Sequence, residues 1–174
     1  DLFIFSDFAR KEKDIESVNR VRSFLNSVDG FRSVTIIERK ENYGLAKNII
    51  EGVTEIIDKY EKVIVLEDDL ITSRNFLCYM NQALDFYEND ERIFAISGYT
   101  GNLPSLEKLE DEGYLSYRPS SWGWATWKRE WIKNDWKVKD FDAFIQNKNA
   151  IKTFNRGGID MTRMLKHCIE GKNH

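Results

Sequence analysis

The feature that most constrains the fold is an alternation of short apolar segments with amphipathic stretches through the first hundred residues. Four apolar segments are predicted to be strands, and between them apolar residues recur at helical spacing. The predicted strands span residues 2–6, 33–38, 62–67 and 92–97. They are uniformly apolar, which is typical of strands covered by helices on both faces. This order predicts a mostly parallel α/β sheet with right-handed crossovers.

The helices between these strands are predicted from apolar periodicity and from their end signals. One begins near Ile15, a second spans 44–60, and a third follows Ser73, whose hydroxyl can cap its first turn. After Gly98 the rhythm gives way to a polar loop, a Trp-rich patch and short helical stretches. We expect a single domain, 1–174, whose first half, 1–100, has the regular strand–helix order and whose second half, 101–174, does not.

Composition and the chain ends narrow the range of functions. The net charge is −3 with acidic and basic residues interspersed, so a nucleic acid is not an expected partner. Cys78 and Cys168 form neither a disulfide framework nor a zinc pattern, which favours a reducing, cytoplasmic compartment. No apolar run approaches the ~18 residues of a membrane helix. The chain opens directly on interior-type sequence, so we expect it to be part of a longer protein.

Carboxylates follow two of the predicted strands. Asp7 ends the first strand, and Glu67, Asp68 and Asp69 end the third in "VIVLEDD". In an open parallel sheet, ligands bind beyond the carboxyl ends of the strands. Three adjacent carboxylates repel one another, and a divalent cation such as Mg²⁺ or Mn²⁺ relieves that repulsion. The alternative is a solvated acidic turn that caps the next helix.

The "VIVLEDD" segment resembles the acidic metal-binding motif of the GT-A nucleotide-sugar glycosyltransferases. The resemblance is closest to the branch of N-acetylglucosaminyltransferases acting on N-glycan and O-mannosyl cores, and to related bacterial sugar transferases. Other segments resemble the family and follow one another along the chain as they do in the family. Before the acidic motif, "IFSD" is similar to the family's second strand, and "ENYGLAKNI" is similar to the helix start that lines its nucleotide pocket. "ISGY" and "SSWGWATWKREW" resemble the segment whose Gly-Trp turn forms the floor of the sugar and acceptor site.

This resemblance implies a GT-A fold whose first strand precedes Asp1. It implies that 1–100 is the nucleotide-binding half and 101–174 the acceptor-side half, with the following roles for single residues. Asp69 would ligate Mn²⁺ or Mg²⁺ between the two phosphates, and Asp68 and Glu67 would face the ribose and donor sugar. Asp7 would accept a hydrogen bond from uracil N3, which favours a UDP-sugar donor. The other expected nucleotide-side residues are Asn42, Gly44 and Lys47, and the expected sugar- and acceptor-side residues are Tyr99, Trp122, Gly123 and Trp124.

The acceptor hydroxyl requires a general base, and two carboxylates are candidates. Asp160, in "GGIDMTRML", resembles the acidic residue that holds this role in the wider family. Asp142, in "WKVKDFDAF", is spaced like the base of the eukaryotic enzymes. Each has an alternative as an ordinary helix N-cap. The helical spacing of Trp124, Trp127 and Trp131 predicts one packed helical face.

Two other readings remain open at this stage. A nucleotidyltransferase also builds an α/β sheet around a metal and a nucleotide, and a degenerate domain would bind a nucleotide-sugar without turnover. The P-loop pattern G-x-x-x-x-G-K-[ST] does not occur, which argues against an ATPase. The favoured hypothesis is a metal-dependent, inverting transfer of a sugar to a glycan or other hydroxyl acceptor. By analogy, it belongs to bacterial surface polysaccharide synthesis.

Overall fold

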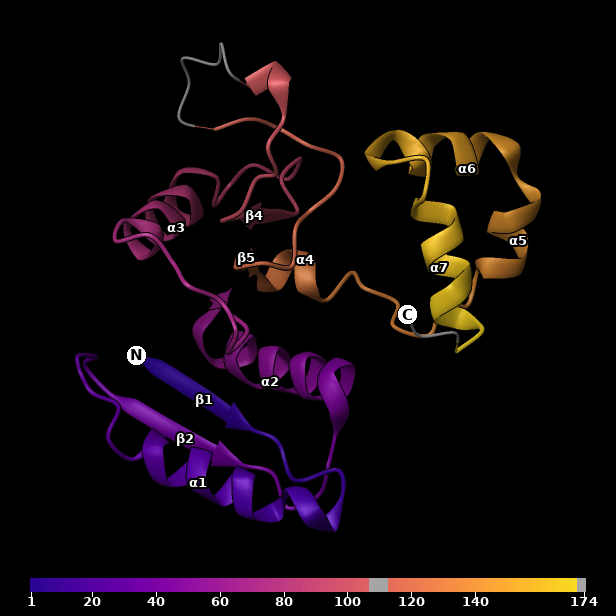
Figure 1. Ribbon diagram of the computed structural model, residues 1–174. Coiled ribbons are helices and arrows are strands. Elements are labelled where there is room, and N and C mark those ends of the chain that lie inside the picture. Colours follow the sequence, from indigo (N-terminus) through magenta and orange to yellow (C-terminus); the bar gives the residue numbers. More distant parts are fainter. Residues whose placement is uncertain (107–112, 172–174) are drawn as a thin grey trace. The chain divides into compact units, whose positions relative to one another are not determined.

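The computed structural model describes residues 1–106 and 113–171, which form a mixed α/β protein with two compact units (Figure 1). The first unit spans Asp1–Glu61 and the second Lys62–His174. The last helix of the first unit ends where Glu61 adopts a left-handed conformation, with its N–H donating to the Ile57 carbonyl at 2.9 Å. The boundary therefore lies well before residue 100, where the two predicted halves meet.

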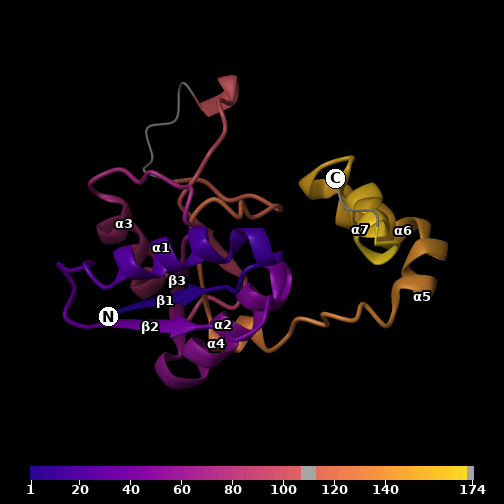
Figure 2. The ribbon, with the colours of Figure 1, turned by 60° about the horizontal axis from the view of Figure 1, so that its bottom comes forward.

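The first unit is a parallel strand pair between two helices. Strands β1 (Leu2–Ser6) and β2 (Val34–Glu38) pair in parallel along their whole length. The short helix η1 (Glu12–Asp14) and α1 (Ile15–Leu25) connect them, and α2 (Gly44–Tyr60) follows β2. Helices α1 and α2 lie on opposite sides of the strand pair in both views (Figure 1, Figure 2). The predicted strand–helix–strand–helix order and the parallel pairing of these strands are confirmed.

Side-chain alternation along β1 explains why both of its faces are covered. The Phe3 ring packs 5.4 Å from the ring of Tyr60, and Phe5 lies so near Gly52 that an added Cβ there would sit 3.2 Å from its ring. Both partners belong to α2. Ser6 instead receives a hydrogen bond from Arg22 of α1. Successive side chains of a strand point to opposite faces, so an apolar strand of this kind needs a helix on each side.

The second unit has a three-stranded sheet in the order β3-β5-β4. Its strands are β3 (Lys62–Val65), β4 (Ala95–Ser97) and β5 (Trp124–Trp127). Strand β5 lies between the other two and runs antiparallel to both, pairing Trp124 with Val65 on one side and with Ser97 on the other. A mostly parallel sheet was expected, and the described strands instead form one parallel pair and one antiparallel three-stranded sheet. A strand from the Trp-rich patch enters between the third and fourth predicted strands.

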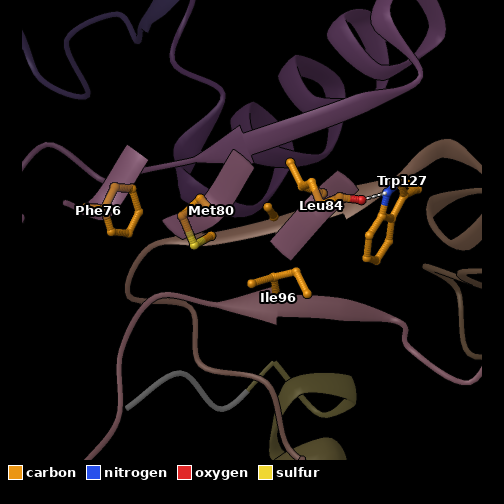
Figure 3. Packing of buried hydrophobic residues seen from close by; sticks show 6 residues of the cluster. Phe76, Met80, Leu84, Ile96 and Trp127 are labelled. Carbon is orange, nitrogen blue, oxygen red and sulfur yellow. Dashed lines mark hydrogen bonds between the residues drawn. The ribbon is translucent and has the colours of Figure 1, made fainter. Parts of the chain in front are cut away.

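Helix α3 (Phe76–Phe86) covers this sheet and forms the core with it. Phe76, Met80 and Leu84 recur every four residues on one face and point toward Ile96 of β4 and Trp127 of β5 (Figure 3). The Trp127 indole N–H donates to the Leu84 carbonyl at 3.2 Å, which satisfies a polar group inside the core. The core thus ties residues from β4, β5 and α3 together within the second unit.

Two local predictions in this unit are wrong. Ser73 does not cap α3 with its hydroxyl, because the helix begins after Asn75 and the Ser73 carbonyl accepts from the Phe76 N–H at 3.1 Å. Trp124 and Trp127 do not share a helical face, because both lie on β5, and Trp131 belongs to the next helix. Long-range pairing with β3 and β4 outweighs the local helical spacing.

The other described elements of the second unit are helices. They are η2 (Pro104–Leu106), α4 (Lys128–Trp131), α5 (Phe141–Gln146), α6 (Lys148–Phe154), η3 (Asn155–Gly157) and α7 (Met161–Ile169). Arg129 of α4 donates hydrogen bonds to three carbonyls at the end of α3, those of Tyr87, Glu88 and Asp90. These hydrogen bonds attach α4 to the loop that follows α3.

Candidate functional site

In the first unit, the structure brings together three of the residues predicted to bind the nucleotide. One oxygen of Asp7 accepts from the N–H groups of Phe8 (2.9 Å) and Tyr43 (2.8 Å). The other accepts from the side chain of Asn42 (3.1 Å) and the N–H of Gly44 (2.9 Å). An ionised carboxylate offers about four lone-pair sites, so these four donors fill its capacity. Asp7 therefore fixes the turn that starts α2.

Gly44 makes this arrangement possible through its backbone conformation. Its φ of +70° lies in the left-handed region, where a side chain would be strained, although no atom would obstruct an added Cβ. Asn42 also donates to the Phe8 carbonyl at 2.6 Å, which joins the segment after β1 to the segment after β2. That Asp7 accepts a hydrogen bond from uracil N3 stays a prediction. Such a bond would require one of the four present donors to Asp7 to be displaced.

Arg22 is a residue of this edge that the sequence reasoning missed. Its Nη2 donates to the carbonyls of Ser6 (3.3 Å), Asp7 (3.3 Å) and Arg39 (2.8 Å), and its Nη1 pairs with Glu38 at 3.2 Å. The side chain is only 13% exposed. Arg22 thus closes the carboxyl ends of both parallel strands. Its position on a helix otherwise patterned for packing gives no local signal of this role.

Lys47, predicted to add charge at the phosphates, lies on the first turns of α2. Its ammonium sits 3.7 Å from the centre of the Tyr43 ring and within 3.9 Å of the carboxylates of Glu41 and Glu51. These contacts draw the side chain toward neighbouring acids. A role at a phosphate stays a prediction.

In the second unit, the acidic turn follows β3 directly. Glu67 is half-buried, whereas Asp68 and Asp69 are exposed. No hydrogen bond or ion pair within the described residues engages any of the three. Among those residues, no group of three His, Cys, Asp or Glu side chains is placed to hold a metal ion by itself. A cation bound at this turn would therefore take further ligands from water or from a bound diphosphate, the arrangement that Mg²⁺ favours.

A pocket of about 270 Å³ adjoins the acidic turn. Its wall includes residues on both sides of that turn, Leu66 and Leu70, and two residues predicted for the sugar site, Tyr99 and Trp122. The other lining residues are Ile71, Thr72, Ser73, Phe76, Gly98 and Gly123. The rings of Tyr99 and Trp122 meet edge to face at 4.6 Å, and both remain about half exposed. The pocket thus has an aromatic rim, and the acidic turn lies between two of its lining residues without itself lining it.

Two glycines and one aromatic ring set the shape of this pocket. The Gly98 N–H donates to the Gly123 carbonyl at 2.7 Å, where the chain leaves β4 and where it returns to β5. The Phe76 ring lies against both glycines, so an added Cβ would sit 2.3 Å from it at Gly98 and 2.9 Å at Gly123. Gly123 also has a φ of +72°. A larger residue at either position would need Phe76 to move.

The structure places the remaining predicted residues away from this pocket's lining. Trp124 stacks on Trp131, with ring centres 5.9 Å apart, so it packs within the unit. Asp142 is exposed in the first turn of α5. Asp160 precedes α7, and both of its oxygens accept from Nη1 of Arg118 at 3.0 Å. Hydrogen bonding from Arg118 holds the pKa of Asp160 below its usual value, which makes this carboxylate a weaker base.

Comparisons of this chain with protein-family models, with curated proteins and with solved structures gave no match. Within residues 1–106 and 113–171, no helix is both long enough and apolar enough to cross a membrane. Function is therefore inferred from the residues around Asp7 and from the acidic turn Glu67–Asp69 with its adjoining pocket.

Proposed function

We propose that this chain is the catalytic domain of a metal-dependent glycosyltransferase that uses a nucleotide-sugar donor. The observation that carries the proposal is the exposed acidic turn Glu67–Asp69, which lacks protein partners within the described residues and adjoins an aromatic-rimmed pocket. The resemblance of the same segments to GT-A enzymes supports it. It extends the proposal to a UDP-sugar, an inverting reaction, and a hydroxyl acceptor in cytoplasmic synthesis of a bacterial surface glycan.

The chemistry of the donor set fits a hard divalent cation. Mg²⁺ and Mn²⁺ take oxygen ligands, and Mg²⁺ is commonly held by one or two carboxylates together with substrate phosphates. Asp69 would supply the carboxylate ligand, and Asp68 and Glu67 would face the ribose and the donor sugar. Bound there, the cation would stabilise the negative charge that the leaving diphosphate gains as the sugar C1–O bond breaks.

The pocket suits a sugar ring on chemical grounds. Tyr99 and Trp122 offer exposed aromatic faces, against which the C–H groups of a pyranose pack, and Thr72 and Ser73 offer hydroxyls for its polar edge. A cavity of 270 Å³ approaches the lower end of the range of small-molecule sites. The aromatic rim and the acidic turn would then hold the two parts of one donor molecule.

A second candidate function is favoured by the state of Asp160. The carboxylate predicted as the general base is paired with Arg118, and that pairing lowers its pKa. A domain without an available base would bind a metal and a nucleotide-sugar without turnover. Asp142, which is exposed, remains the alternative base for the transferase.

Thermal unfolding with nucleotides tests the proposal. All five tryptophans lie in the second unit, so their fluorescence reports on the unit that holds the acidic turn. UDP, GDP, CDP and dTDP would each be added with and without Mn²⁺, and a ligand at 100 times its Kd should stabilise by ~2.7 kcal/mol. We expect a rise in Tm that requires both Mn²⁺ and one of the nucleotides. It should be lost in Asp69→Asn and kept in Asp142→Asn, and stabilisation that is equal in both variants would contradict the proposal.

A further inference from the structure

The contact between residues 117–118 and the corner before α7 includes the Arg118–Asp160 pair and several further interactions that the proposed chemistry does not use. We propose that this contact, here termed the clasp, is a positioning device for the pocket wall that carries Trp122, with Arg118 as the positioning residue. The clasp consists of Tyr117 and Arg118 on one side and Arg156, Gly157, Gly158 and Asp160 on the other. The inference does not depend on which ligand occupies the pocket.

The charged half of the clasp joins residues 42 positions apart in the chain. Nη1 of Arg118 donates to both carboxylate oxygens of Asp160 at 3.0 Å, and Nη2 lies 3.2 Å from the Met164 sulfur. The two side chains are 40% and 34% exposed, so water reaches both members of the pair. Asp160 thus serves as the acceptor that fixes the Arg118 guanidinium.

The aromatic half reinforces the same contact from the neighbouring residues. The Arg156 guanidinium lies over the Tyr117 ring, 3.9 Å from its centre, and also donates to the Tyr117 hydroxyl. Cation–π contact and hydrogen bond together orient both side chains. Each side of the clasp therefore contributes one arginine to a partner on the opposite side.

The two glycines show that the backbone, and not only the side chains, is shaped for this contact. An added Cβ at Gly157 would lie 2.8 Å from the Tyr117 carbonyl oxygen. At Gly158, where φ is +153°, it would lie 2.6 Å from an Asp160 oxygen and 3.0 Å from Arg118 Nη1. Only glycine permits this approach at both positions. A chance surface ion pair would not require it.

The backbone links the clasp to the pocket, because Arg118 is followed by Pro119 and then by Ser120, which is hydrogen-bonded near the pocket wall. Two residues after Arg118, the Ser120 N–H donates to the Ser97 hydroxyl at 2.9 Å. The Trp122 N–H donates to the Ser120 hydroxyl at 3.2 Å, and the Gly98 N–H closes the rim on the Gly123 carbonyl. The clasp therefore anchors one end of a segment whose other end is a wall of the pocket. Displacing α7 would shift Trp122.

The corner that holds Asp160 is itself fixed. The Asn155 side-chain oxygen accepts from both the N–H (3.0 Å) and the hydroxyl (2.8 Å) of Thr162, across the turn between η3 and α7. Asp160 lies inside this turn. The acceptor of the clasp is therefore held by α7 and does not merely follow the movements of Arg118.

Amide hydrogen exchange measured residue by residue by NMR tests the clasp without any ligand. We expect Arg118→Gln and Asp160→Asn each to speed exchange of the Ser120 and Gly98 amides about two- to five-fold. The matched control is Arg92→Gln. Arg92 pairs with Asp90 at 2.7 Å in the same unit but has no link to the pocket, so this variant should leave both amides unchanged.

Reversal of the charges separates positioning from simple loss of a side chain. The double variant Arg118→Asp with Asp160→Arg should return the two amides toward wild-type exchange. Unchanged exchange in both single variants would overturn the proposal. An equal rise in the exchange rate of the buried Met80 amide would also overturn it, because that would indicate general loosening of the unit and not a shift of the pocket wall.

Discussion

Replacing Gly98 by alanine tests the packing that shapes the pocket. The added Cβ would lie 2.3 Å from one carbon of the Phe76 ring and 3.2 Å from the Gly123 carbonyl oxygen. Phe76 is only 7% exposed and packs in the core, and the one open space beside it is the pocket that it lines. Because the φ of Gly98 is outside the left-handed region, the expected cost comes from steric overlap alone. Overpacking of this kind costs about 1–3 kcal/mol.

The assay is thermal unfolding followed by tryptophan fluorescence, which reports on the second unit alone. At about 2–4 °C per kcal/mol for a chain of this size, Gly98→Ala should lower Tm by roughly 2–12 °C. Gly101→Ala is the matched control, because no atom lies within 4 Å of the position its Cβ would take. It should unfold close to wild type.

A double-mutant cycle then identifies the source of the cost. If the alanine collides with the Phe76 ring, Phe76→Leu should recover part of the loss, giving a coupling energy of about 0.5–3 kcal/mol. Equal Tm values for Gly98→Ala and Gly101→Ala would refute a collision between the added Cβ and the Phe76 ring. Simple additivity of the free-energy changes from the Gly98 and Phe76 substitutions would refute it as well.

Three further predictions concern buried and paired charges. Arg22→Lys should destabilise the first unit by about 2–4 kcal/mol, because an ammonium cannot reproduce donation to three carbonyls and Glu38. Urea unfolding followed by circular dichroism measures this loss, and a loss under ~0.5 kcal/mol would contradict the role of Arg22. Asp7→Asn should cost about 1–2 kcal/mol in the same assay even without nucleotide, since an amide offers one acceptor oxygen where the carboxylate offers two. Hydrogen bonds from the Arg92 side chain and N–H lower the pKa of Asp90 to about 2, so its stabilising effect should be complete above pH ~4 and disappear as the pH falls toward 2. NMR titration of the Asp90 carboxyl should locate that pKa, and Arg92→Gln should raise it toward the usual value.

Much of the first unit could be predicted because its signals are local. Residues 44–60 carry a long apolar stripe, and the observed α2 has the predicted bounds. Strand β1 likewise matches its apolar segment. The role of Arg22 was missed because its partners come from two separate segments of chain, and no sequence spacing indicates that the carbonyls of Ser6, Asp7 and Arg39 converge.

The second unit was harder to predict because its topology depends on non-local pairing. Strand β5 has a Trp at each end three residues apart, a spacing that also fits a helix, and only its pairing with β3 and β4 makes it extended. The pocket was anticipated in part, since Tyr99, Trp122 and Gly123 do line one cavity. Trp124 does not, because its ring stacks on that of Trp131. The pairing of Asp160 with Arg118 depends on loop geometry that the sequence does not encode locally.

The most direct test of the central claim is electron paramagnetic resonance of Mn²⁺ titrated into this chain with and without UDP. Free Mn²⁺ gives a six-line signal that broadens on binding. We predict that protein and UDP together remove more of the free signal than the sum of their separate effects. This excess should vanish in Asp69→Asn and persist in Asp142→Asn. Simple additivity in the wild-type chain, or an excess that survives in Asp69→Asn, would contradict a metal–diphosphate site at the acidic turn.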